Sequence, residues 1–192
     1  MTYRLLQALD RWVIRHDRIE PIGSGGYILR VKLTRHRGGR IVLRDGTVIR
    51  PGDPLAELHL DNERAAALHA EGHSGIRFRR EIYRALAALA GEFARREEYR
   101  PIAAVFGASL FWAEATHAGF EYRDLSPFTR WWLGWWERYL LSQYHPEGRR
   151  RLDRGRRTVL REVWMSRATV LAFARGGAAA AAGGSSRGGR DQ

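Results

Sequence analysis

The chain has no cysteine among its 192 residues. Disulfides, thiolate nucleophiles and thiolate metal sites are therefore excluded. Lysine is nearly absent too, because Lys32 is the single lysine among 33 basic residues. No apolar run approaches the roughly 18 residues of a membrane span, and residues 1–10 place charge where a signal peptide needs an apolar stretch. These absences predict a cytoplasmic protein.

Common nucleotide-binding and nucleic-acid-binding motifs are missing as well. The chain has no Gly-x-Gly-x-x-Gly, no Walker lysine, no helix-turn-helix, no zinc finger and no RNP-type motif. What it has is positive charge: 33 basic residues stand against 21 acidic ones, a formal net charge of +12. This excess favours a polyanionic partner such as anionic lipid headgroups or nucleic acid, but a solvated basic surface explains it equally well.

Length and composition predict one folded domain and a tail. Hydrophobic residues make up 44% of the chain, enough for a substantial core without a cofactor or a disulfide. We expect a single domain over residues 1–175. From Gly176 the sequence is rich in Gly, Ala, Ser and Arg and has nothing to bury, which predicts a disordered tail over residues 176–192.

The first half shows the period of two that is typical of half-buried strands. Residues 27–34 alternate between apolar and polar side chains, and residues 55–60 do so again. Between them, two short apolar runs flank Asp45-Gly46, a dipeptide that favours a tight hairpin turn. Together these four segments predict an antiparallel four-stranded meander.

Helical spacing dominates the rest of the chain. Amphipathic patterns predict helices over residues 3–16, 62–70, 76–98, 127–144 and 158–174. An apolar strand over residues 102–106, a helix over residues 109–118 and a return strand at residues 119–122 predict a small βαβ-like unit. The predicted fold class is α+β, with the helices packed on one side of the sheet.

Several segments carry a resemblance to a known family. They read RVKLTRHRG at residues 30–38, VLRDGTVI at 42–49, GDPL at 52–55 and LHLDN at 58–62. Later segments are GFE at residues 119–121, HPEG at 145–148 and VWMS at 163–166. The sequence resembles the YkoP-like domain family, whose members occur alone or attached to bacterial polysaccharide deacetylases. This resemblance implies a role in envelope polysaccharide or lipid metabolism and supplies no catalytic residues.

A polar group is predicted where the strand at residues 55–60 leads into a helix. His59, Asp61 and Asn62 lie at this junction, and Arg30 and Lys32 share the polar face of the neighbouring strand. Together they predict a basic pocket for an anion, with His59 as an acid or a base. The alternative is structural, with Asp61 or Asn62 as a helix cap and His59 on a half-exposed strand.

Two weaker signals concern a phosphate and a metal. Gly107 and Ser109 follow an apolar strand and open a predicted helix, where free backbone N–H groups hold a phosphate, although ordinary turns carry the same residues. His69 and His73 are four residues apart on one helix face, but no third ligand accompanies them. We therefore predict no metal site.

The helix over residues 127–144 is unusually aromatic. Its tryptophans, with Trp132 and Trp136 as the candidates, suit the boundary of a bilayer, and an arginine-rich connector follows that suits anionic headgroups. The arginines proposed for this surface contact are Arg149, Arg150, Arg151 and Arg154. The alternative is that the aromatic stripe packs as core.

These observations lead to one preferred function and two alternatives. The preferred function is a non-catalytic accessory or regulatory domain in envelope polysaccharide or lipid metabolism. We expect it to act at the cytoplasmic face of the membrane, with an anionic membrane surface or an envelope-biosynthesis protein as partner. The alternatives are a small enzyme with an anion-binding pocket around His59, and a nucleic-acid-binding domain that uses arginines and aromatics.

Overall fold

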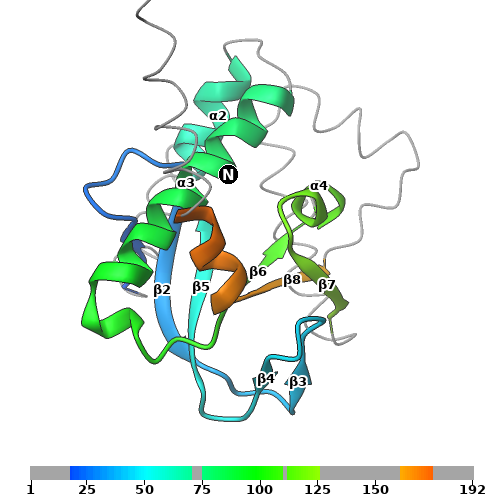
Figure 1. The fold of residues 1–192 in the computed structure, drawn as a ribbon. Helices are drawn as coiled ribbons and strands as arrows, with labels where there is room; N and C mark the ends of the chain where they lie inside the picture. Colours follow the sequence, from blue (N-terminus) through cyan, green and yellow to red (C-terminus); the bar gives the residue numbers. More distant parts are fainter. Residues whose placement is uncertain (1–17, 71–74, 110–111, 126–160, 175–192) are drawn as a thin grey trace, which may run out of the picture.

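The computed structural model describes residues 18–70, 75–109, 112–125 and 161–174, which form a six-stranded sheet, a separate hairpin and several helices (Figure 1). The predicted first helix, the tryptophan-rich helix over residues 127–144 and the tail over residues 176–192 lie outside these described residues.

Two long strands that pair directly form the first half of the sheet. β2 (Leu29–Arg35) and β5 (Pro54–Leu60) run antiparallel, with Val31 opposite Leu58. Opposed residues of an antiparallel pair share a face, so the alternating sequence gives these strands one apolar face and one polar face.

The sheet continues beyond β5 with both parallel and antiparallel neighbours. Its order is β1-β2-β5-β6-β8-β7, and the β5–β6 pair is parallel while the other pairs are antiparallel. The remaining strands are β1 (Glu20–Pro21), β6 (Ala104–Ser109), β7 (Glu121–Asp124) and β8 (Arg161–Ser166). This mixture of helices and a mostly antiparallel sheet confirms the α+β class.

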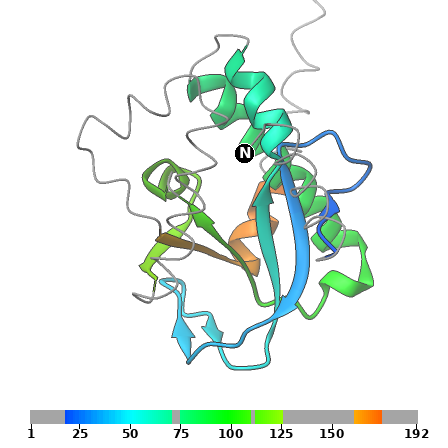
Figure 2. The ribbon, with the colours of Figure 1, turned by 180° about the vertical axis from the view of Figure 1, so that it is seen from behind.

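The predicted meander was wrong in its pairing, although all four strands exist. β3 (Ile41–Val42) and β4 (Val48–Ile49) pair only with each other, as a separate two-stranded sheet. Each of these strands has only two residues, whereas β2 and β5 have seven each. β2 therefore gains more hydrogen bonds by pairing with β5 than it would by pairing with β3. The β3–β4 hairpin lies at the opposite end of the main sheet from α2 (Figures 1 and 2).

The turn of this hairpin differs slightly from the predicted two-residue connection. The Leu43 N–H donates to the Thr47 carbonyl at 2.9 Å, and the Gly46 N–H donates to the Leu43 carbonyl at 3.0 Å. Three residues therefore form the loop, and Gly46 alone takes a positive φ, of 85°. Such a turn ends in a left-handed position that glycine adopts without strain.

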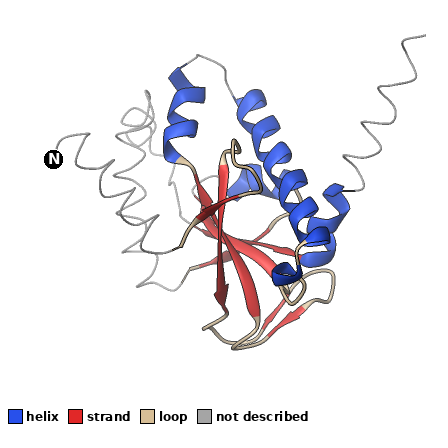
Figure 3. Ribbon diagram, turned by 90° about the vertical axis from the view of Figure 1, so that its left-hand side faces the viewer, coloured by secondary structure: helices blue, strands red, loops and turns tan. Residues whose placement is uncertain are grey.

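The helices cover one face of the sheet, as predicted (Figure 3). The helical elements are α2 (Asn62–Ala70), α3 (Gly75–Arg95), the 3-10 helix η1 (Glu97–Tyr99), α4 (Trp112–His117) and a last helix over residues 167–174. The predicted apolar stripe of α3 is buried at Leu86, Leu89 and Phe93. These side chains share one core cluster with Val31 and Val105 of the sheet.

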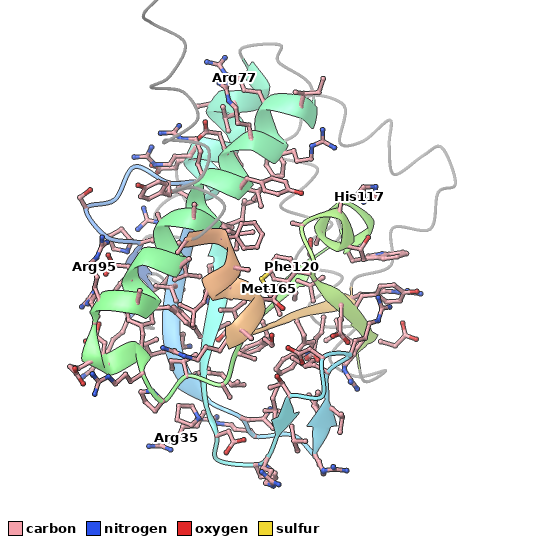
Figure 4. All side chains as sticks on the ribbon, viewed as in Figure 1. Arg35, Arg77, Arg95, His117, Phe120 and Met165 are labelled. Carbon is pink, nitrogen blue, oxygen red and sulfur yellow. The ribbon has the colours of Figure 1, made fainter. Side chains whose placement is uncertain are left out.

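The second half of the chain forms a split βαβ unit. The predicted helix and return strand are present as α4 and β7, but β8 lies between the parallel strands β6 and β7. The prediction of one helix over residues 158–174 was therefore wrong for residues 161–166. Figure 4 shows Met165 of β8 beside Phe120, and both side chains belong to the main core.

Tyr99 closes one end of this core and makes stability sensitive to alkali. The residue is 2% exposed, and burial raises the pKa of its hydroxyl from 10.0 to about 12. The unfolded chain releases this proton first, so the stabilisation is complete below pH 10 and is lost as pH rises towards 12.

We therefore expect Tyr99→Phe to protect the protein against alkali. Urea unfolding near pH 9 and near pH 11.5 should show that the wild type loses about 2 kcal/mol more than the variant between these values. Equal losses in the two proteins would show that Tyr99 stays neutral in both states or ionises without cost.

Candidate functional site

The pairing of β2 with β5 brings the predicted polar residues onto one face of the sheet. Arg30 lies directly opposite His59, and Lys32 lies opposite Glu57. All four side chains are half-buried. Because the register places them side by side on the face opposite to Val31 and the main core, they form one polar surface.

Asp61 anchors this surface at the end of β5. Its side chain is 8% exposed, and Oδ2 accepts a hydrogen bond from Arg30 Nε at 3.0 Å and lies 2.8 Å from Arg30 Nη2. Oδ1 accepts a hydrogen bond from the backbone N–H of Arg64 at 3.1 Å. This second bond caps the N-terminus of α2, as the sequence predicted, and leaves neither carboxylate oxygen uncommitted.

A second arginine lies close to the same carboxylate. Arg64 Nε is 3.7 Å from Asp61 Oδ2, and Arg64 Nη1 donates to the Gly26 carbonyl at 3.0 Å. Two guanidinium groups therefore share the Asp61 carboxylate, and Glu57 adds a second carboxylate on the same face. The sequence did not point to Arg64, because an arginine in the first turn of a helix is common and does not by itself indicate a binding site.

His59 has a ring nitrogen without a hydrogen-bond partner. Its Nε2 atom is buried and, within the described part of the protein, makes no hydrogen bond. The Glu57 carboxylate is 3.5 Å away, close enough for an ion pair if the ring is protonated but too long for a good hydrogen bond. Buried polar atoms are nearly always paired, so this nitrogen is an exception among the described residues.

The structure thus brings most of the predicted polar residues together. Arg30, His59 and Asp61 meet in what we call the polar cluster, which also contains Glu57 and Arg64. Lys32 lies one step along the same face of β2. Asn62 is the first residue of α2, and Asp61 takes the capping role for which both were candidates.

The structure does not place Gly107 and Ser109 in the turn that the predicted phosphate site requires. β6 runs through Ser109 and α4 begins at Trp112, so Gly107 and Ser109 lie in a strand and not in a turn that opens a helix. A Cβ on Gly107 would lie 2.9 Å from the Leu58 carbonyl oxygen. The glycine is explained by this close approach of the two strands.

The tryptophans and arginines predicted for a surface contact lie outside the residues that the structure describes. These are Trp132, Trp136 and the arginines from 149 to 154. Arg161 lies in β8, where its guanidinium is 4.2 Å from the Trp112 ring centroid and 4.4 Å from that of Tyr122. This stacking explains Arg161 as a structural residue of the β7–β8 edge.

Two kinds of feature are absent from the described residues. No three His, Asp or Glu side chains in the described ranges are grouped so as to hold a metal ion. None of the described helices is long and apolar enough to span a membrane.

The fold and the polar cluster define an α+β domain on a mixed sheet, with helices on one face and charged residues on the other. The sequence model of the YkoP domain matches residues 1–174, so the chain belongs to the YkoP domain family. This confirms the resemblance seen in the sequence; the association with deacetylases stays a prediction.

A relative and the solved structures were also compared. The chain is similar to "Uncharacterized protein YkoP" of Bacillus subtilis (strain 168), with 26% identity over 108 residues, which is 54% of this chain and 59% of the relative. The match therefore spans less than two thirds of that relative. No solved structure matches the chain significantly.

Proposed function

We propose that this protein is a non-catalytic accessory domain that binds an anionic group at the polar cluster. The unpartnered Nε2 of His59, beside Arg30, carries the proposal. A protonated imidazole or a neutral ring with its proton on Nε2 donates one hydrogen bond to an anion. Arg30, Arg64 and Lys32 against Asp61 and Glu57 give this face a net positive charge, which favours the same ligand.

The same geometry argues against acid–base catalysis. Asp61 is held by Arg30 and by the cap of α2, so it is not available to move a proton. Glu57 and His59 are 3.5 Å apart, outside the hydrogen-bond range of about 2.6–3.2 Å by which a carboxylate orients a catalytic histidine. A binding function therefore fits the cluster better than an enzyme does.

The proposal extends to the cellular context. The resemblance to domains found beside polysaccharide deacetylases favours envelope polysaccharide or lipid metabolism, where many intermediates carry phosphate, diphosphate or carboxylate groups. The net charge of +12 favours action at the anionic inner face of the membrane. An anionic lipid surface or an envelope-biosynthesis protein is the partner that we propose.

A titration with simple anions tests the proposed site. We expect inorganic phosphate or diphosphate at millimolar concentration to shift the imidazole resonances of His59 in nitrogen-labelled protein. His59→Gln should weaken binding about ten-fold, the loss of one charge-assisted hydrogen bond.

The control changes an exposed histidine far from the cluster. His117→Gln, on α4 (Figure 4), should leave the affinity unchanged. Unshifted His59 resonances with both anions, or equal losses in the two variants, would remove the polar cluster as the binding site.

A further inference from the structure

The β3–β4 hairpin has one buried face and one outward face. On the buried face Ile41 lies opposite Ile49, which is 0% exposed. Ile49 and Leu43 form a small second core with Trp164 of the main sheet. The hairpin is therefore held on the sheet by apolar burial through one of its two faces.

The outward face combines valines with flanking arginines. Val42 lies opposite Val48, and Val42 is 42% exposed. Arg40 comes directly before β3 and Arg50 directly after β4, and both side chains are exposed. The two short strands thus carry an exposed arginine at the same end of the hairpin.

The arginines of the outward face have no acidic partner. Within the described part of the chain, no carboxylate pairs with the guanidinium of Arg40 or Arg50. The two aspartates of the segment serve its turns instead. Asp45 accepts a hydrogen bond from the Thr47 N–H at 2.9 Å, and Asp53 accepts one from the Arg50 N–H at 2.7 Å.

Three further arginines extend this basic surface. They are Arg35, Arg37 and Arg44, and all are exposed, although Arg44 Nε lies 4.0 Å from a carboxylate oxygen of Glu121. Figure 4 shows Arg35 projecting from the lower end of the molecule, where the hairpin lies. Residues 35–53 thus carry five arginines against two aspartates.

Contacts with β7 hold the hairpin in a fixed orientation. The Arg44 N–H donates to Glu121 Oε1 at 2.6 Å, and the Arg123 guanidinium donates to the Val42 carbonyl. The pKa of Asp45 is lowered, chiefly by a hydrogen bond from the Ser166 hydroxyl at the end of β8. Because the arginines stand on an anchored support, little backbone order has to be gained when they bind.

We infer that the outward face of this hairpin, defined by Arg40, Val42, Val48 and Arg50, docks on the surface of an anionic bilayer. The inference deepens the membrane part of the proposed function and rests on it. Guanidinium groups pair with lipid phosphates, and the valines between them add apolar contact at the interface. No aromatic ring lies on this face to stack on bases, which disfavours single-stranded nucleic acid.

Vesicle flotation of the full chain tests the inference. Vesicles of phosphatidylglycerol and phosphatidylcholine, and of phosphatidylcholine alone, are compared at low and high salt. We expect binding to the anionic vesicles, and we expect the double variant Arg40→Gln/Arg50→Gln to bind at least about twenty-fold more weakly, from about five-fold for each arginine near such a surface.

A matched double variant separates the hairpin from general charge. Arg79→Gln/Arg80→Gln removes the same charge from exposed positions of α3 and should lose much less binding. Circular dichroism and thermal melting establish that both variants fold. Val42→Ser should lower the binding that persists at high salt, because that part is apolar.

Three other results of these experiments would each contradict a particular claim. If the two double variants lose binding equally, the hairpin inference fails and the membrane proposal stands. If the wild type does not bind anionic vesicles at low salt, both fail, and the anion site at His59 is still decided by its own titration. If an oligonucleotide binds through the hairpin while vesicles do not, the surface is a nucleic-acid interface and the inference is wrong.

Discussion

Replacing Trp164 by alanine should lower the free energy of unfolding by about 3–5 kcal/mol, the usual cost of removing a large buried aromatic side chain. The side chain is 2% exposed and stacks on Phe106 with ring centroids 4.8 Å apart. His36 meets it edge-on at 5.8 Å. Urea unfolding measured by far-ultraviolet circular dichroism gives this value.

The same variant should loosen the β3–β4 hairpin before the rest of the fold. Trp164 is the largest side chain in the small core beneath the hairpin. Its loss should let the hairpin unfold locally, so that trypsin cleaves at the already exposed arginines under native conditions. Trp164→Phe keeps an aromatic ring on Phe106 and should lose less than half as much stability. A Trp164→Ala protein within about 1 kcal/mol of the wild type would show that this core contributes little.

Arg167→Met should destabilise the protein by about 3 kcal/mol, because two carbonyl groups would lose charged donors in a part-buried place. Arg167 begins the last helix and donates to the Phe93 carbonyl at 3.0 Å and to the Tyr99 carbonyl. It thereby joins the end of α3 to η1, and burial lowers the pKa of its guanidinium. Chemical denaturation near neutral pH measures the loss.

Two further variants show whether the lost stability comes from the hydrogen bonds of the Arg167 guanidinium. Arg167→Lys keeps the charge but replaces the planar fork with a single ammonium, so partial destabilisation is expected. Arg100→Met removes an exposed arginine whose ion pair with Glu97, at 3.1 Å, is on the surface, and it should change stability by no more than about 0.5 kcal/mol. If Arg167→Met matched Arg100→Met, the two carbonyl bonds would carry no net stabilisation.

Local patterns in the sequence predicted the elements better than their partners. The alternation in β2 and β5 and the Asp45-Gly46 turn are local signals, and each led to an element that exists. Pairing depends on strand length and on burial across the sheet, which one sequence does not reveal. For this reason the sequence predicted a meander of four consecutive strands. In the structure β2 pairs directly with β5, and the hairpin between them is not part of the main sheet.

β8 was missed for a different physical reason. Val163, Trp164 and Met165 are all buried, so this strand has apolar residues on both faces and no alternation. A short apolar run of this kind cannot be told from a buried helical segment by periodicity. The helix that follows it directly completed the appearance of one long helix.

The candidate site was partly predictable. The capping role of Asp61 and the shared polar face of Arg30 and Lys32 follow from spacing and alternation. The ion pair between Arg30 and Asp61, 31 residues apart, and the unpartnered nitrogen of His59 depend on the register of β2 and β5. Register is set by the whole sheet, so these features emerged only from the structure.

The position of β8 in the chain also determines when the sheet can be completed during synthesis. β7 pairs only with β8 among the described strands, and 36 residues separate the end of β7 from the start of β8. During synthesis, β7 must leave the ribosome and wait unpaired until Ser166 has emerged. The sheet is therefore completed late, and the edges of β6 and β7 that β8 covers stay open until then.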